Sequence, residues 1–120
     1  MKRSDAPRGL LAVATTVMLV LPASAAGILA AQNGMTLYTF DKDSDGKSAC
    51  YDDCATNWPP YIAAEGEEMP AGWTRIDRDD GTVQWALDGK PLYFYVEDVA
   101  SGDAKGDGKG GVWHVVPAAD

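Results

Sequence analysis

One pattern occurs twice in the sequence, and it constrains the fold more than any other feature. Residues 37–43 read LYTFDKD and residues 92–98 read LYFYVED, so both copies have the form L-Y-x-aromatic-x-x-D. A glycine follows each copy within four residues, at Gly46 and at Gly102. The agreement position for position favours a true internal repeat over chance. We therefore expect two related segments in one fold.

The repeated pattern is typical of a strand that ends in a turn. Alternate residues of a strand share one face, so the two aromatic side chains of each copy should lie on the same side. Three residues later the chain should be leaving the strand, and an aspartate there can accept hydrogen bonds from turn N–H groups. The predicted structural motif consists of Tyr38, Phe40, Asp43, Tyr93, Tyr95 and Asp98.

Other segments also have the alternation and the turn residues of an antiparallel sheet. Residues 73–96 contain two Asp-Gly pairs, which are typical of tight turns, and predict a three-stranded meander whose third strand is 91–96. A last strand is expected over 111–116. Residues Cys50 to Trp58 favour one short helical segment, which the two following prolines would end. The predicted fold is a small, mainly β, antiparallel domain.

The N-terminal residues have the order of a secretory signal peptide. Basic residues precede an apolar run over 9–21, and the small residues Ala23-Ser24-Ala25 follow it. We expect residues 1–25 to be cleaved, and a cut nearer Ala31 is the alternative. The apolar run is shorter than the roughly 20 residues of a membrane span, and no cysteine near the cut would carry a lipid. Residues 26–120 would then form one periplasmic or secreted β domain.

The charge of the chain excludes some classes of partner. It has 18 Asp and Glu against 10 Lys and Arg, a net charge of −8, and cleavage would remove three basic residues and one acidic residue. Nucleic-acid phosphates need a basic surface, so we expect no nucleic-acid partner. The acidity suits cations, or it keeps an exported protein soluble. An envelope protein or a metal ion fits as a partner, and the sequence specifies no oligomeric state.

Cys50 and Cys54 are the two cysteines of the chain. Export to an oxidising compartment favours a disulfide between them, and on a helical turn residues at i and i+4 are close enough to form one. The alternative is a copper or thiol-redox site, because thiolates and imidazole suit copper. His114 would complete that site, with Met35 or Met69 as a further soft ligand.

A second metal alternative lies in the loop after the first copy of the pattern. Asp41, Asp43, Asp45 and Gly46 match the opening of an EF-type calcium loop, and Asp52 stands at its position 12. That position normally holds a bidentate glutamate, and no entering helix is expected before Asp41. We favour an acidic, solvated turn and keep calcium as the alternative.

Catalytic patterns are weak in this chain. A Ser/His/Asp site would need His114 beside a poised serine, but Ser44, Ser48 and Ser101 stand in predicted loops without an elbow motif. The glycines of residues 106–111 precede no helical pattern, so they predict a loop rather than a phosphate cradle. We therefore predict no enzymatic activity and no obligatory cofactor.

The tryptophans allow two interpretations. Exposed indole rings would form a sugar- or peptide-binding face, whereas buried rings would supply much of the core of a small β domain. We favour the core. The residues concerned are Trp58, Trp73, Trp85 and Trp113.

Four segments together resemble the bacterial secreted-repeat family, described as predicted lipoproteins with a Y-x-aromatic-x-x-D motif. In order they read LYTFDKD, CYDDCATNWPPY, DGTVQWALDGKPLYFYVED and GGVWHVV, and they span about residues 34–117. The resemblance implies a small exported domain from a family whose function is uncharacterised. The chain departs from the lipoprotein label because it lacks a lipobox cysteine. We expect a non-enzymatic role in the cell envelope.

Overall fold

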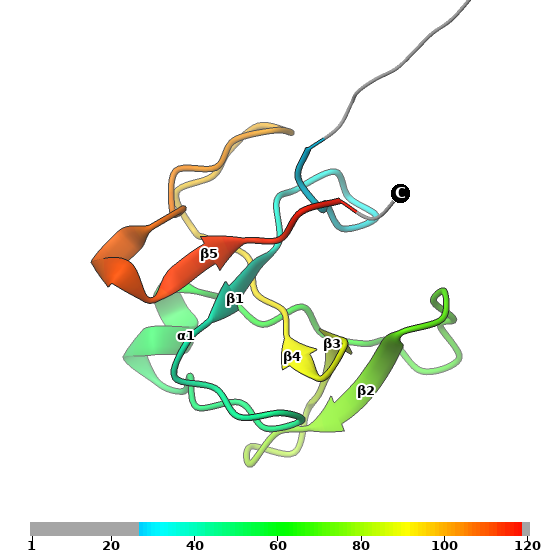
Figure 1. Ribbon diagram of the computed structural model, residues 1–120. Coiled ribbons are helices and arrows are strands. Elements are labelled where there is room, and N and C mark those ends of the chain that lie inside the picture. The colour runs from blue at the N-terminus through cyan, green and yellow to red at the C-terminus, as the bar shows by residue number, and fades with distance from the viewer. Residues whose placement is uncertain (1–26, 119–120) are drawn as a thin grey trace, which may run out of the picture.

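The computed structural model describes residues 27–118, and the expected signal peptide lies outside this range (Figure 1). The described chain is mainly strand, as predicted, with two small antiparallel sheets and little helix. Within this range no helix is long and apolar enough to cross a membrane. The elements in order are β1 (Tyr38–Phe40), α1 (Asp53–Asn57), β2 (Trp73–Asp77), β3 (Val83–Leu87), β4 (Lys90–Pro91), the 3-10 helix η2 (Lys109–Gly111) and β5 (Trp113–Val115).

The two sheets join different parts of the chain. β1 pairs with β5, from the far end of the sequence, with Phe40 opposite Trp113 (Figure 1). β2, β3 and β4 form the predicted meander, in which Trp73 lies opposite Leu87. The predicted helical segment is confirmed as α1, which ends before Pro59.

The third strand of the meander is shorter than predicted. Asp88 and Gly89 have φ values of 53° and 84° and form the turn, but β4 ends at Pro91. From Tyr93 onward the chain pairs with the first half instead. The N–H of Tyr93 donates to the carbonyl of Tyr38 at 3.0 Å, and the N–H of Tyr38 donates to the carbonyl of Tyr93 at 2.8 Å. The backbone groups that the meander leaves unpaired are thus satisfied by the other repeat.

The two halves of the chain interlock through equivalent bonds. The N–H of Asp41 donates to the carbonyl of Val112 at 2.8 Å, and the N–H of Val96 donates to the carbonyl of Asn57 at 3.0 Å. Asp41 and Val96 occupy the same place in the two copies of the pattern, directly after the second aromatic residue. The arrangement is therefore close to two-fold symmetric, and each half completes the strand pairing of the other.

The core consists of two clusters, and the Leu-Tyr pair of each copy of the pattern connects them. Consecutive strand residues point to opposite sides, so the leucines enter one cluster and the tyrosines enter the other. The first cluster contains Tyr38, Cys50, Trp58, Tyr93, Tyr95 and Trp113. The second contains Ala31, Leu37, Tyr61, Trp85 and Leu92. The core interpretation therefore holds for Trp58, Trp85 and Trp113, whereas Trp73 is half-buried.

Candidate functional site

The tyrosine of each repeat binds the aspartate of the other repeat. The Tyr38 hydroxyl donates to Asp98 Oδ2 at 2.7 Å, and the Tyr93 hydroxyl donates to Asp43 Oδ2 at 2.7 Å. The sequence predicted the aspartates as turn residues within their own repeats. It did not predict this exchange of partners.

Each aspartate also holds the loop that follows it. Asp43 Oδ1 accepts the N–H of Ala49 at 2.7 Å, and Asp98 Oδ1 accepts the N–H of Lys105 at 2.9 Å. Burial, with the neighbouring carboxylate, raises the pKa of the Tyr38 hydroxyl well above its usual value. Burial also raises the pKa of Tyr93, and the bond to Asp43 adds to the shift. Both phenols therefore remain protonated donors at neutral pH.

Four aromatic rings form a continuous stack between the two halves. Phe40 lies on Trp113 with centroids 4.1 Å apart, Trp113 lies on Trp58 at 3.9 Å and 3°, and Trp58 lies on Tyr95 at 4.2 Å. Phe40 and Tyr95 are equivalent in the two copies, so the stack follows the same symmetry as the hydrogen bonds. Trp58 and Trp113 occupy corresponding positions in the two halves of the sequence, and this correspondence is the signal that could have predicted the stack.

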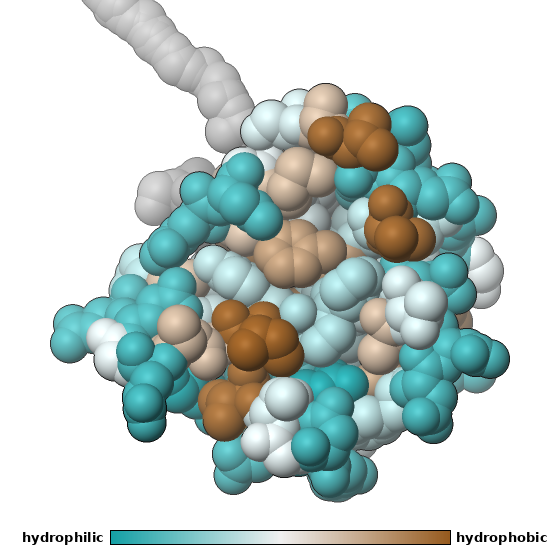
Figure 2. Space-filling view, turned by 180° about the vertical axis from the view of Figure 1, so that it is seen from behind, coloured by the Kyte–Doolittle hydropathy of each residue, from teal (hydrophilic) through white to brown (hydrophobic). Residues whose placement is uncertain are grey.

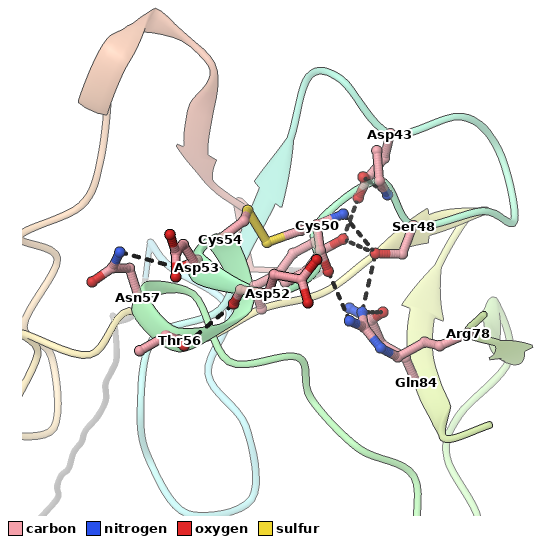
Figure 3. Close-up of a disulfide and its surroundings, with 12 residues drawn as sticks. Asp43, Ser48, Cys50, Asp52, Asp53, Cys54, Thr56, Asn57, Arg78 and Gln84 are labelled. Atoms are coloured by element: carbon pink, nitrogen blue, oxygen red, sulfur yellow. Dashed lines mark hydrogen bonds between the residues drawn. A yellow bond between two sulfur atoms is a disulfide. The ribbon is translucent and has the colours of Figure 1, made fainter. Parts of the chain in front are cut away.

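A buried arginine ties the meander to the loop before α1 (Figure 3). The Arg78 side chain is 1% exposed. Its Nη1 donates to Ser48 Oγ at 3.0 Å and to Gln84 Oε1 at 2.9 Å, and its Nη2 donates to the Cys50 carbonyl at 2.7 Å. Because Tyr93 donates to Asp43, the 2.6 Å bond between Tyr93 and Ser48 has the serine as donor. No sequence pattern predicted this network.

The predicted disulfide is present. The sulfurs of Cys50 and Cys54 are bonded, with the Cα atoms 5.2 Å apart (Figure 3). The two residues do not share one helical turn as expected, because Cys50 precedes α1 and Asp52 between them has a φ of 55°. Cys50 is fully buried and both cysteines pack against the aromatic cluster. The disulfide therefore holds α1 against the ring stack.

Comparison with protein families explains the internal symmetry. A family model described as a secreted repeat of unknown function matches residues 24–61 and 74–117, one match for each half. The chain belongs to this secreted-repeat family. Searches of curated proteins and of solved structures found no significant match. The family is described as secreted, so the chain is an exported protein whose role is uncharacterised.

In this secreted-repeat protein the copper candidates do not form one site. The sulfurs of Cys50 and Cys54 are joined, so neither is a thiolate ligand. His114 Nε2 lies 2.8 Å from Asp41 Oδ2, in a partly exposed pair. Met69 contacts Gln32, and Met35 lines a surface hollow with Phe94. Within residues 27–118 no three His, Cys, Asp or Glu side chains are grouped to hold a metal.

The calcium candidates do not form one complete ligand set in the described part of the chain. Asp41 pairs with His114, and Asp43 is bound to Tyr93 and to the Ala49 N–H. Asp52 precedes α1. Asp41, Asp43 and Asp45 line a cleft of about 150 Å³ that Lys90 also lines, and Asp52 is not part of it. The EF-type ligand set is therefore not assembled.

A wider open cleft, of about 380 Å³, lies beside the meander, and no sequence pattern predicted it. Trp85 Nε1 donates to Glu67 Oε1 at 3.0 Å, and the Arg75 guanidinium lies 4.7 Å from the Trp85 ring centroid. A bond from the Ala64 N–H lowers the pKa of Glu67, so this carboxylate is ionised at neutral pH. The lining residues are Glu67, Glu68, Met69, Trp73, Thr74, Arg75 and Trp85.

Large apolar side chains are also exposed, but on the face of Figure 2 they form separate groups between polar ones. The exposed residues of this kind are Ile28, Ile62, Val96 and Val99. Small separate groups are normal on a soluble surface and do not by themselves mark an interface.

Proposed function

We propose that this secreted-repeat protein is a non-enzymatic binding domain of the cell envelope, and that its ligand is an envelope saccharide. The main observation behind the proposal is that the side chains able to act as acids, bases or nucleophiles are hydrogen-bonded to one another and stabilise the fold. A chain of hydrogen bonds runs from the half-buried Asp43 through the buried side chains of Tyr93, Ser48 and Arg78. A catalytic acid or base must reach its substrate, and these groups already have partners inside the protein.

The proposed binding surface is the cleft beside Trp73. An indole ring offers an apolar face to the carbon-bound hydrogens of a sugar, and nearby charged groups suit its hydroxyls. Glu67 uses Oε1 for its bonds to Ala64 and Trp85, which leaves Oε2 as an acceptor. Arg75 donates to the carbonyls of Ala64 and Glu67 through Nη2, which leaves Nη1 as a donor.

The test is sedimentation of the purified mature protein with insoluble bacterial cell-wall sacculi. We expect the protein to sediment with them and Trp73→Ala to reduce the bound fraction at least tenfold. His114→Ala is the matched control, because His114 lies on β5 and does not line the cleft. Circular dichroism checks that both variants fold. Glu68→Gln, at an exposed position of the cleft, repeats the test if Trp73→Ala unfolds.

Two results would contradict the proposal. Release of soluble sugar from the sacculi by wild-type protein would show an enzymatic activity. Equal sedimentation of wild type and both cleft variants would remove the cleft as the binding surface. Fractionation of cells that express the full chain tests the expected location, since the protein should be found in the periplasm or the medium.

A further inference from the structure

Many contacts that close the first core cluster connect one half of the chain with the other. They include the two tyrosine–aspartate bonds, the Trp58–Trp113 stack and the pairing of β1 with β5. Tyr38 and Tyr93 also exchange backbone bonds between the halves. None of these contacts requires that the two halves belong to the same copy of the chain.

The covalent connection between the halves is a single surface segment. Residues 63–72 read AAEGEEMPAG, and most of them are exposed. Gly66 and Gly72 have positive φ values of 80° and 95°. Its hydrogen bonds lie within the segment or run to the second half, as those from Ala63 to Val83 and from Trp85 to Glu67 do. The exception is Met69, whose sulfur accepts a bond from Gln32 of the first half. A segment of this kind can serve as a hinge, because only its own path changes when the halves separate.

We propose that two copies of the protein exchange repeats and form a closed dimer. In this dimer residues 27–62 of each copy pack with residues 73–118 of the other copy, and residues 63–72 form the two crossings. The contacts among the buried residues of the two core clusters are kept, whereas Ala63 and Met69 of the hinge pack against the second cluster and would move. Both copies bury the same surface, so the assembly closes and does not extend into a fibre. The partner that this interface fits is a second copy of the chain.

Arg78 favours the pairing of a first half with a second half over the pairing of two like halves. Each half carries the tyrosine, aspartate, second aromatic residue and tryptophan of the symmetric contact, so pairing of like repeats would keep those contacts. The buried Arg78 belongs to the second half, and it binds Ser48 and the Cys50 carbonyl of the first half. Two like repeats would leave these buried polar groups without partners, which is costly. Exchange therefore occurs between unlike repeats.

Exchange must take place during folding. Opening a folded copy would expose the whole aromatic stack, so folded monomers should interconvert slowly. Refolding at high protein concentration lets a half meet the complementary half of another copy before its own. We therefore expect monomers from dilute refolding and a separable dimer from concentrated refolding.

The test uses two full-length mature variants, Trp58→Leu and Trp113→Leu. Each lacks one member of the stacked indole pair, so neither alone shows the circular dichroism couplet of that pair. When the two are unfolded, mixed and refolded together, an exchanged dimer contains one core unit with both tryptophans. We expect a dimer by light scattering and a return of the couplet in the dimer fraction.

The matched control mixes Trp58→Leu with the double variant Trp58→Leu/Trp113→Leu, because no exchange between these chains restores the pair. Mixing the folded single variants without unfolding should also give no couplet. A dimer without the couplet, or a refolded mixture that remains monomeric at every concentration, would overturn the proposal.

A second measurement keeps the core intact in case the tryptophan variants do not fold. Deleting Glu65 and Gly66 shortens the hinge and makes closure within one copy harder, so the dimer fraction after refolding should rise. Inserting flexible residues at the same place should lower it. A dimer fraction that is independent of hinge length would contradict exchange.

Discussion

The Tyr38 hydroxyl donates a 2.7 Å hydrogen bond to Asp98, which lies 60 residues further along the chain. The same bond joins Tyr93 to Asp43 in the opposite direction. The tyrosine and the aspartate of one Y-x-aromatic-x-x-D motif therefore do not bind each other. The motif is a device for joining two repeats, because each copy supplies the donor for one bond and the acceptor for the other.

The exchange of partners predicts a specific pattern of energetic coupling. Tyr38→Phe should lower the free energy of unfolding by about 1.5–3 kcal/mol, since it removes a bond to a buried carboxylate. In double-mutant cycles Tyr38→Phe should couple to Asp98→Asn by about 1 kcal/mol or more. Its coupling to Asp43→Asn should stay within about 0.5 kcal/mol. Urea unfolding measures all these variants, and equal coupling to both aspartates would contradict the exchange.

The disulfide should stabilise the protein modestly, because it closes a short loop. Replacing both cysteines, as Cys50→Ala/Cys54→Ala, should lower the free energy of unfolding by about 2 kcal/mol on the loop-entropy estimate. Reductant should lower the stability of the wild type toward that of the variant. The variant itself should not respond to reductant, and a wild type that is also insensitive would refute the role of the disulfide.

Gly106 should tolerate no side chain because it contacts the ring stack. A Cβ atom there would overlap the Trp58 ring and lie 3.0 Å from Tyr95 Cδ2. Gly106→Ala should therefore destabilise the fold by about 1–3 kcal/mol through overpacking. Gly27→Ala is the control, since a Cβ at Gly27 meets no atom within 4 Å. Thermal unfolding compares the two, and equal stability would argue against a tightly packed stack.

The Asp43 carboxyl should make stability depend on pH in an unusual direction. Burial raises its pKa above the usual value, against the Ala49 and Tyr93 bonds. The folded state then holds a proton that the unfolded state has released. The stability from this group is present below the unfolded pKa of about 3.9 and is lost as pH rises through the folded pKa. Relative to Asp43→Asn, the wild type should lose free energy of unfolding as pH rises above about 4.

Glu67 provides a control of opposite sign for the pH experiment. The Ala64 and Trp85 bonds lower the pKa of Glu67, so its stabilising contribution is present above the unfolded pKa. It is lost as pH falls through the folded pKa. Relative to Glu67→Gln, the wild type should lose stability on acidification. Urea unfolding at several pH values measures both differences, and slopes of the same sign would contradict the assignment.

Much of the local structure follows from the sequence, whereas the site does not. The alternation of residues 37–40 and the Asp-Gly turns predict strands because side-chain periodicity is a local property. The disulfide between Cys50 and Cys54 is predicted because they are the two cysteines of a chain that is expected to be exported. The partners of Arg78, the ring stack and the end of β4 at Pro91 were missed. Each of these depends on contacts between residues that are far apart in sequence.

The repeat, the mainly β class, the disulfide and membership of a secreted family all follow from the amino-acid sequence alone. These features reside in the order and spacing of residues such as Tyr38 and Tyr93. The three-dimensional packing was needed to show that each tyrosine binds the aspartate of the other repeat and that Trp58 lies on Trp113. A short motif is compatible with a partner in either copy, and the choice depends on the packing energy of the whole interlocked core.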